Sequence, residues 1–259
     1  MTWTTQPRSS LSGLSAIARG TGPNLLLLHG VGLRAEAWAA QFGLPARIVA
    51  PDMPGHGESP WTDTITSLED FVCAGLGVLN GLDAPVIVVG HSMGAMLALE
   101  LARRAPDVVT AVVSLNAVFE RSLPAQKAVE GRAAGLDGLS IPDQTQTLER
   151  WFGTDACAER EACASWLSDV HPAAYKCAYT AFATSQIPNR KGLSHLSCPA
   201  LFITGSEEPN STPEMSQTMA SLAPMGRSII VDGAAHMMPM THSNEVNAAI
   251  LSVINEMSA

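Results

Sequence analysis

The chain has 259 residues, of which 46% are hydrophobic and 15% are charged, so it holds enough apolar side chains for a large buried core and is not disordered. Its formal net charge of -9 argues against nucleic acid as a partner, because binding a phosphate backbone requires a concentrated positive patch. Residues 1–20 lack the pattern of a signal peptide, and no apolar segment approaches the roughly 20 residues that cross a bilayer, so we expect a cytoplasmic protein without a membrane partner.

Short runs rich in Val, Ile and Leu recur along the chain, each followed by turn residues. They cover residues 24–28, 47–50, 85–89, 110–115, 199–204 and 228–231. Continuous apolar runs are typical of strands that are covered on both faces, as in parallel sheets. Helical patterns lie between them, at residues 68–82, 93–104, 213–222 and 244–257. The alternation predicts an α/β fold with a mostly parallel central sheet flanked by helices.

The alternation breaks at residues 118–197, where strand patterns disappear and helix-compatible sequence takes over. This segment carries many of the aromatic residues of the chain: Trp151, Phe152, Trp166, Tyr175, Tyr179 and Phe182. Ordinary packing of small helices accounts for most of these rings, and a helical lid over a pocket is the functional interpretation. We predict one core, made of residues 1–117 and 198–259, with residues 118–197 inserted as a helical cap.

The pentapeptide GHSMG at residues 90–94 lies between a predicted strand and a predicted helix, which is the context of a nucleophile elbow. A serine on so tight a turn is in strained backbone geometry, so its neighbours must be small, as Gly90 and Gly94 are. Ser92 is therefore the candidate nucleophile, and the alternative is a structural serine that caps the helix. His91 points away from its neighbour on such a turn and is interpreted as a packing residue.

Two further stretches are similar to segments of known proteins. LLLLHGVG at residues 25–32 is similar to a strand followed by an oxyanion loop, and PDMPGHGES at residues 51–59 is similar to the stretch after the next strand. With the elbow, they make the chain resemble the α/β-hydrolase superfamily from about residue 14 to 257, in its serine esterase and enol-lactone hydrolase branch. The resemblance implies a nucleophile, then an acid after a later strand, then a histidine near the C-terminus.

Residues 201–213, LFITGSEEPNSTP, resemble the strand and loop where the family usually carries an aspartate. Glu208 occupies the matching position and is the candidate acid, although a glutamate is one methylene longer. Glu207 is its close rival, and the alternative is that both are solvated loop charges. Asp232 is interpreted as a turn partner. Either carboxylate can hold a histidine ring in the required tautomer and stabilise its charged form.

His236 lies in a loop directly after the last predicted strand, where the resemblance places the histidine of the family. Near neutral pH, a histidine can take the proton of a serine and pass it to a leaving group. His236 is therefore the candidate base. His242 falls within the start of the following helix and ranks behind it.

The candidate oxyanion hole consists of two backbone N–H groups, those of Val31 and Met93. Removing one donor from such a hole costs about 3 to 4 kcal/mol of transition-state stabilisation. His29 is expected to be a structural hydrogen-bonding residue. Residues 52–59 are expected to support the loop under the site, and His56 is not expected to be catalytic.

These roles predict a serine hydrolase that cleaves a small carboxylic ester or lactone through an acyl-enzyme on Ser92. No cofactor or metal is needed, and the five cysteines show no metal-ligand spacing. The alternatives on the same triad are a cofactor-free perhydrolase or acyltransferase and a C–C bond hydrolase. An alternative from another class is a ligand receptor that keeps this fold without turnover.

The predicted partner is a small-molecule substrate whose identity depends on how residues 118–197 cover the pocket. Arg121, Lys127, Arg132 and Lys176 are candidates for contact with an acidic substrate, although isolated surface bases are the favoured interpretation. Oligomeric state stays open, and a homo-oligomer is possible.

Overall fold

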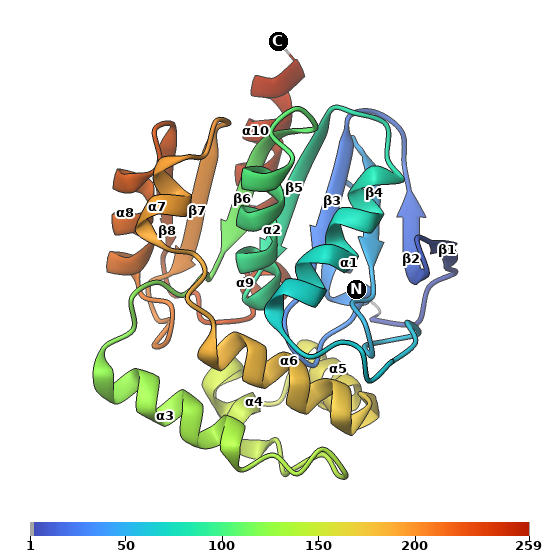
Figure 1. Cartoon of the computed structure of the whole chain (residues 1–259), viewed down its shortest axis with the longest axis vertical. Coiled ribbons are helices and arrows are strands. Elements are labelled where there is room, and N and C mark those ends of the chain that lie inside the picture. The colour runs from blue at the N-terminus through green and yellow to red at the C-terminus, as the bar shows by residue number, and fades with distance from the viewer. Residues whose placement is uncertain (1–2, 259) are drawn as a thin grey trace.

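The computed structural model describes residues 3–258, so residues 1, 2 and 259 of the predicted core lie outside it. Within these residues, a single eight-stranded sheet has the order β1-β2-β4-β3-β5-β6-β7-β8. The strands are β1 (Ser9–Leu11), β2 (Leu14–Arg19), β3 (Asn24–Leu28), β4 (Arg47–Pro51), β5 (Val86–His91), β6 (Val109–Leu115), β7 (Ala200–Gly205) and β8 (Gly226–Val231). All neighbouring pairs from β4 to β8 are parallel, so the predicted α/β fold is confirmed (Figure 1).

The edge formed by β1 and β2 is antiparallel and was not predicted. The two strands form a hairpin whose turn residues Ser12 and Gly13 both have positive φ angles, of 50° and 82°. Such a two-residue turn matches the twist of a hairpin. β1 is short and mostly exposed, so it lacks the apolar run that marks the central strands.

Alternate residues of the central strands pack into two separate clusters, one on each face of the sheet. Leu26 and Leu28 of β3 belong to the cluster that includes α1 (Leu68–Asn80) and α2 (Met93–Arg104). Leu25 and Leu27 belong to the cluster that includes α10 (Ser243–Ser258). Burial on both faces explains why these strands are continuously apolar.

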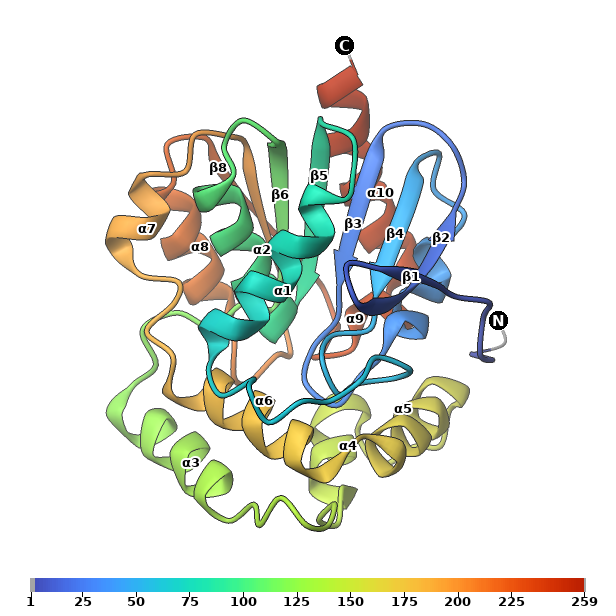
Figure 2. The same ribbon diagram turned by 45° about the vertical axis from the view of Figure 1, so that its right-hand side comes forward.

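The remaining core helices complete the two layers. A 3-10 helix η1 (Ala35–Gln41) and the short α9 (Met238–Thr241) pack with α10, and α8 (Pro213–Leu222) lies on the α1 and α2 side (Figures 1 and 2). No helix within residues 3–258 is both long enough and apolar enough to span a membrane.

The segment 118–197 is helical, as its sequence predicts. It contains α3 (Leu123–Ala134), α4 (Thr145–Phe152), α5 (Ala158–Asp169), α6 (Pro172–Thr184) and α7 (Arg190–Ser194). Helices α3 to α6 lie together across the end of the sheet where the parallel strands finish (Figures 1 and 2). We call these four the cap helices. α7 lies beside α8, and its Leu193 is part of a core cluster.

Candidate active site

Ser92 lies on a sharp turn between β5 and α2. Its φ and ψ angles of 58° and -119° are in a sparsely populated region, which costs on the order of 1–3 kcal/mol. The turn is held because the Ser92 N–H donates to the carbonyl of Leu115 at 2.9 Å. A side chain at Gly90 would overlap the backbone of Gly94, and one at Gly94 would overlap the backbone of Leu28. The glycine spacing is therefore a direct requirement of this turn.

Glu208 and His236 come from the loops after β7 and β8 and meet in a buried contact. The His236 Nδ1–H donates to Glu208 Oε2 at 2.6 Å. Glu208 Oε1 also accepts from the backbone N–H groups of Asn210 and Ser211, at 2.8 and 3.4 Å. Burial raises the pKa of the Glu208 carboxyl, but attraction to His236 and these hydrogen bonds outweigh it, so the pKa lies below its ordinary value. The carboxylate fixes the ring so that Nε2 is its free nitrogen.

The backbone of His236 is also held in place. Its carbonyl accepts from His91 Nε2 at 2.8 Å and from Asn116 Nδ2 at 2.8 Å. Burial lowers the pKa of His91 to about 3, with repulsion from His236 as a further cause, so His91 is neutral. His91 is thus a hydrogen-bond donor as well as the packing residue that was predicted. Asn116 was missed, although it is the first residue after β6, at the carboxyl end of the sheet.

The loop that carries Val31 lies directly against Ser92. A Cβ atom at Gly30 would be 3.0 Å from Ser92 Cβ, which is closer than most contacts of this kind, so the loop packs tightly against the turn. Met93 is the first residue of α2, and its N–H has no acceptor within the helix. His29 fixes the loop, since its Nδ1 lies 2.8 Å from the Gly30 carbonyl and its Nε2 accepts from the Met53 N–H at 2.9 Å. Backbone N–H groups beside a nucleophile can receive a developing oxyanion, and this role stays the prediction for Val31 and Met93.

The other candidate residues lie outside this arrangement. Glu207 is exposed, whereas Glu208 is buried. Asp232 accepts a hydrogen bond from the Ser206 hydroxyl at 3.4 Å. His242 pairs with the neighbouring Thr241 hydroxyl at 3.0 Å. None of the three lines the pocket above Ser92.

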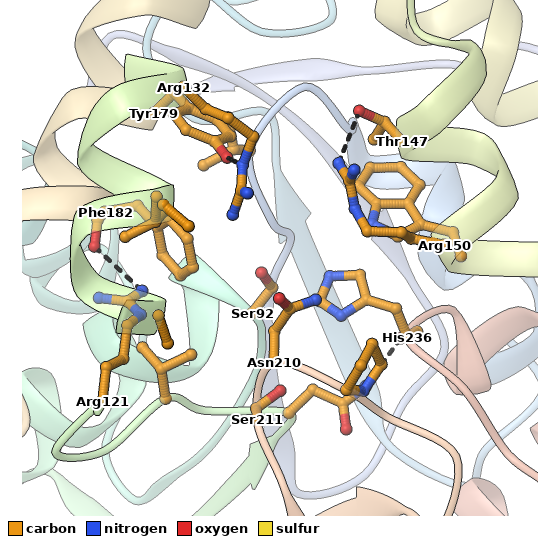
Figure 3. A pocket seen from close by; sticks show the side chains of 18 of the residues that line it. Ser92, Arg121, Arg132, Thr147, Arg150, Tyr179, Phe182, Asn210, Ser211 and His236 are labelled. Carbon is orange, nitrogen blue, oxygen red and sulfur yellow. Dashed lines mark hydrogen bonds between the residues drawn. The ribbon is translucent and has the colours of Figure 1, made fainter. Parts of the chain in front are cut away.

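Ser92 and His236 open into one pocket of about 160 Å³, closed on its far side by the cap helices (Figure 3). Three arginines line it: Arg121, from the segment before α3, Arg132 of α3, and Arg150 of α4. Figure 3 shows Arg132 and Arg150 on either side of the space above Ser92 and His236. No aspartate or glutamate among residues 3–258 lines this pocket, so its charged lining consists of the three arginines.

The three arginines have neutral partners only. Arg132 donates to the Tyr179 hydroxyl at 2.9 Å, and Arg150 donates to the Thr147 hydroxyl at 3.2 Å. The Arg121 guanidinium lies over the ring of Phe182, 4.6 Å from its centroid, and burial lowers its pKa. In the part of the chain that the structure describes, none of the three forms a salt bridge.

The expectation about basic residues is therefore corrected in part. Arg121 and Arg132 line the pocket, although Arg132 is also exposed, whereas Lys127 and Lys176 do not line it. Arg150 was not singled out, because a cation in a short helix gives no sign in the sequence of the direction in which it points. The described residues contain no cluster of three or more His, Cys, Asp or Glu side chains suited to a metal ion.

Comparison with known proteins gives relatives that span nearly the whole chain. The (E)-2-((N-methylformamido)methylene)succinate hydrolase of Acinetobacter baylyi is 37% identical over 241 residues, which is 90% of each protein. A pimeloyl-[acyl-carrier protein] methyl ester esterase of Stenotrophomonas maltophilia is 27% identical over 258 residues, covering 92% of this chain and 95% of the relative.

Solved structures show the same fold. A thermophilic esterase from Thermogutta terrifontis superposes with a TM-score of 0.81 at 23% identity, covering 97% of this chain and 99% of the esterase. The enol-lactonase from Burkholderia xenovorans gives 0.78 at 22% identity, covering 96% and 100%. The model of the alpha/beta hydrolase family matches residues 25–249. The chain therefore belongs to the alpha/beta hydrolase family of enzymes, as the resemblance of its motifs implied.

Proposed function

We propose that this chain is a serine hydrolase that cleaves an N-acyl bond in a small substrate bearing two carboxylates, of the (acylamino)methylene-succinate class. The observation that carries the proposal is the set of three arginines without acidic partners above Ser92 and His236. Arg121 and Arg150 are partly buried, and a partly buried guanidinium with no counter-ion is costly. A carboxylate is the natural ligand of an arginine because the two can pair through two parallel hydrogen bonds.

The number and placement of the arginines favour more than one carboxylate. Arg132 and Arg150 lie on either side of the space above Ser92 and His236, whereas Arg121 lies beside Phe182 (Figure 3). A substrate with a single carboxylate would leave at least one of these cations without a partner. The volume of about 160 Å³ suits a small molecule.

The relative from Acinetobacter baylyi supports the substrate class, because its name describes a succinate that carries an N-methylformamido group. Such a molecule combines two carboxylates with an N-acyl bond. This replaces the ester or lactone favoured from the sequence alone. A carboxylic ester of similar charge is the second candidate, favoured by the likeness over 92% of the chain to the methyl ester esterase.

The proposed mechanism uses the roles expected from the sequence. His236 Nε2 takes the proton of Ser92, and the alkoxide attacks the acyl carbon while the N–H groups of Val31 and Met93 receive the oxyanion. The C–N bond breaks, and His236 returns the proton to the departing nitrogen. Water, activated by the same ring, then releases the acyl group as a carboxylic acid. Glu208 stabilises the imidazolium in both halves.

We also propose that the cap helices act as the lid of this site. They supply Arg132 and Arg150, so the same segment closes the pocket and recognises the charge of the substrate. A second hollow lies between α3 and α4, and Arg132 and Arg150 line both this hollow and the pocket. An anion that entered through the hollow would meet these two arginines on its way to Ser92.

The test is a comparison of three substrates with the same scissile N-formyl group: the dicarboxylate, its monoester and its diester. We expect kcat/KM to fall by about 10-fold or more with each carboxylate removed, because a hydrogen bond to a charged group contributes about 1.5–3 kcal/mol. Ser92→Ala sets the background. Equal kcat/KM for the dicarboxylate and the diester would contradict the substrate class, and activity in Ser92→Ala would contradict the mechanism.

A further inference from the structure

The imidazole of His236 contacts an aromatic ring that belongs to the cap. The indole of Trp151 on α4 is stacked on it, with ring centroids 5.3 Å apart and planes inclined by 24°. The ring of His91 lies 4.8 Å from the same imidazole at a tilt of 52°, from the core side. His236 is thus held between strand β5 and the cap, in addition to its bond to Glu208.

The charged groups around His236 suggest a role for the stacked indole. Glu208 is the anion in contact with the imidazole, and His91 is neutral. Arg121, Arg132 and Arg150 line the same pocket, so the charge that His236 gains during proton transfer forms beside cations. The face of an indole carries negative electrostatic potential and attracts a cation that lies over it. Trp151 is therefore placed to offset part of the repulsion from the arginines at the moment when His236 becomes charged.

Helix α4 combines this contact with substrate binding. Trp151 follows Arg150 directly, and the helix ends one residue later at Phe152, where Gly153 caps it with a φ angle of 74°. Leu148 is the buried residue of the helix, and Trp151 and Phe152 are partly buried against the same hydrophobic cluster. The position of α4 therefore decides whether the indole of Trp151 covers the imidazole of His236.

We propose that Trp151 is a positioning residue: its indole face holds the imidazole of His236 and stabilises the imidazolium formed during proton transfer. Helix α4 then contributes to the chemical step as well as to substrate recognition. This inference rests on the proposed function, in which His236 activates Ser92.

The test is the rate at which a small uncharged alkyl fluorophosphonate inactivates the full-length protein. This probe reacts with an activated serine and offers no carboxylate to the arginines, so its rate reports on Ser92 and His236 without substrate recognition. We expect Trp151→Leu to react about 2- to 30-fold more slowly, the factor that corresponds to a cation–π contribution of about 0.5–2 kcal/mol. Trp151→Phe keeps an aromatic face and should recover much of the rate.

The matched control is Trp61→Leu. Trp61 also stacks on a histidine, His171, with centroids 6.2 Å apart and planes inclined by 26°, but neither residue lines the pocket above Ser92. Its removal should leave the inactivation rate unchanged. On the dicarboxylate substrate, Trp151→Leu should lower kcat by a larger factor than it raises KM, because the indole acts through His236.

Two results would overturn the inference while the proposed function stands: labelling of Ser92 at the wild-type rate in Trp151→Leu, or a Trp151→Phe variant as slow as Trp151→Leu. The second result would mean that the residue serves only to fill space. Absence of labelling in the wild-type protein would instead remove the proposed function, and the inference with it. Thermal unfolding of each variant shows that the compared proteins are folded.

Discussion

Replacing Glu208 by glutamine separates the charge of this residue from its shape. The carboxylate accepts the His236 Nδ1–H at 2.6 Å and is 3% exposed. A glutamine at this position has no charge to stabilise an imidazolium. Its NH₂ group can also donate to Nδ1, which would move the ring proton to Nε2, the atom that has to accept the proton of Ser92.

The size of the effect follows from this geometry. A short hydrogen bond to a charged group is stronger than one between neutral groups. A His236 ring in the wrong tautomer leaves Ser92 without a base. In an equivalent triad, removing the charge of the acid lowers kcat by about 10⁴-fold. We expect Glu208→Gln to lower kcat by about 10³- to 10⁴-fold, or about 4–5.5 kcal/mol. KM should change little, because Glu208 does not line the pocket.

Steady-state kinetics on the dicarboxylate substrate measure this effect, and Glu207→Gln is the matched control. The Glu207 side chain is exposed, and its structural contact is the backbone N–H bond to the Ala234 carbonyl at 2.9 Å, which glutamine retains. The control should stay within about two-fold of wild type, as surface substitutions usually do. A larger loss for Glu207→Gln than for Glu208→Gln would refute the assignment of the acid.

Three further outcomes are expected. Arg150→Gln should raise KM for the dicarboxylate by about 10- to 100-fold, since a hydrogen bond to a charged group is lost, and an equal rise for a neutral ester would count against a carboxylate contact. Gly90→Ala should lower the free energy of unfolding, measured in urea, by more than about 3 kcal/mol, because the new methyl group overlaps the backbone of Gly94. The control Gly131→Ala has open space around the new methyl group and should raise the free energy of unfolding by about 0.5–1 kcal/mol. Burial lowers the pKa of His56 from 6.5 to about 3, so the unfolded chain binds the extra proton between these values and stability falls as pH falls. His56→Phe should make that slope shallower by up to about 1.4 kcal/mol per pH unit, and parallel slopes would contradict it.

The central fold could be predicted from the sequence because burial on both faces leaves a clear pattern. Strands β3 to β7 are mostly apolar and mostly buried, and α2 and α8 have the predicted bounds. β8 was predicted from the run at residues 228–231, although most of this strand is not buried. The hairpin of β1 and β2 leaves no such run, because β1 is mostly exposed and β2 is buried only in its first part and ends in exposed residues. Short helices such as η1 and α9 also carry too few turns for a helical period to be recognised.

The parts of the site that depend on local backbone were also predictable. Gly90 and Gly94 are required by the turn at Ser92, and the contact between Glu208 and His236 follows from loops at neighbouring strand ends. Arg150 and the stacking of Trp151 on His236 could not be predicted, because they depend on how the cap helices lie over the sheet. The catalytic roles themselves stay predictions.

The central claim is that the acyl group of the substrate passes through Ser92. The most direct measurement is rapid acid quenching of the enzyme during turnover of the N-formyl dicarboxylate, followed by peptide mass spectrometry. The account predicts a formyl ester on the peptide that contains Ser92 and none in Ser92→Ala. Turnover at the wild-type rate in Ser92→Ala, or an acyl group located on another residue, would contradict it.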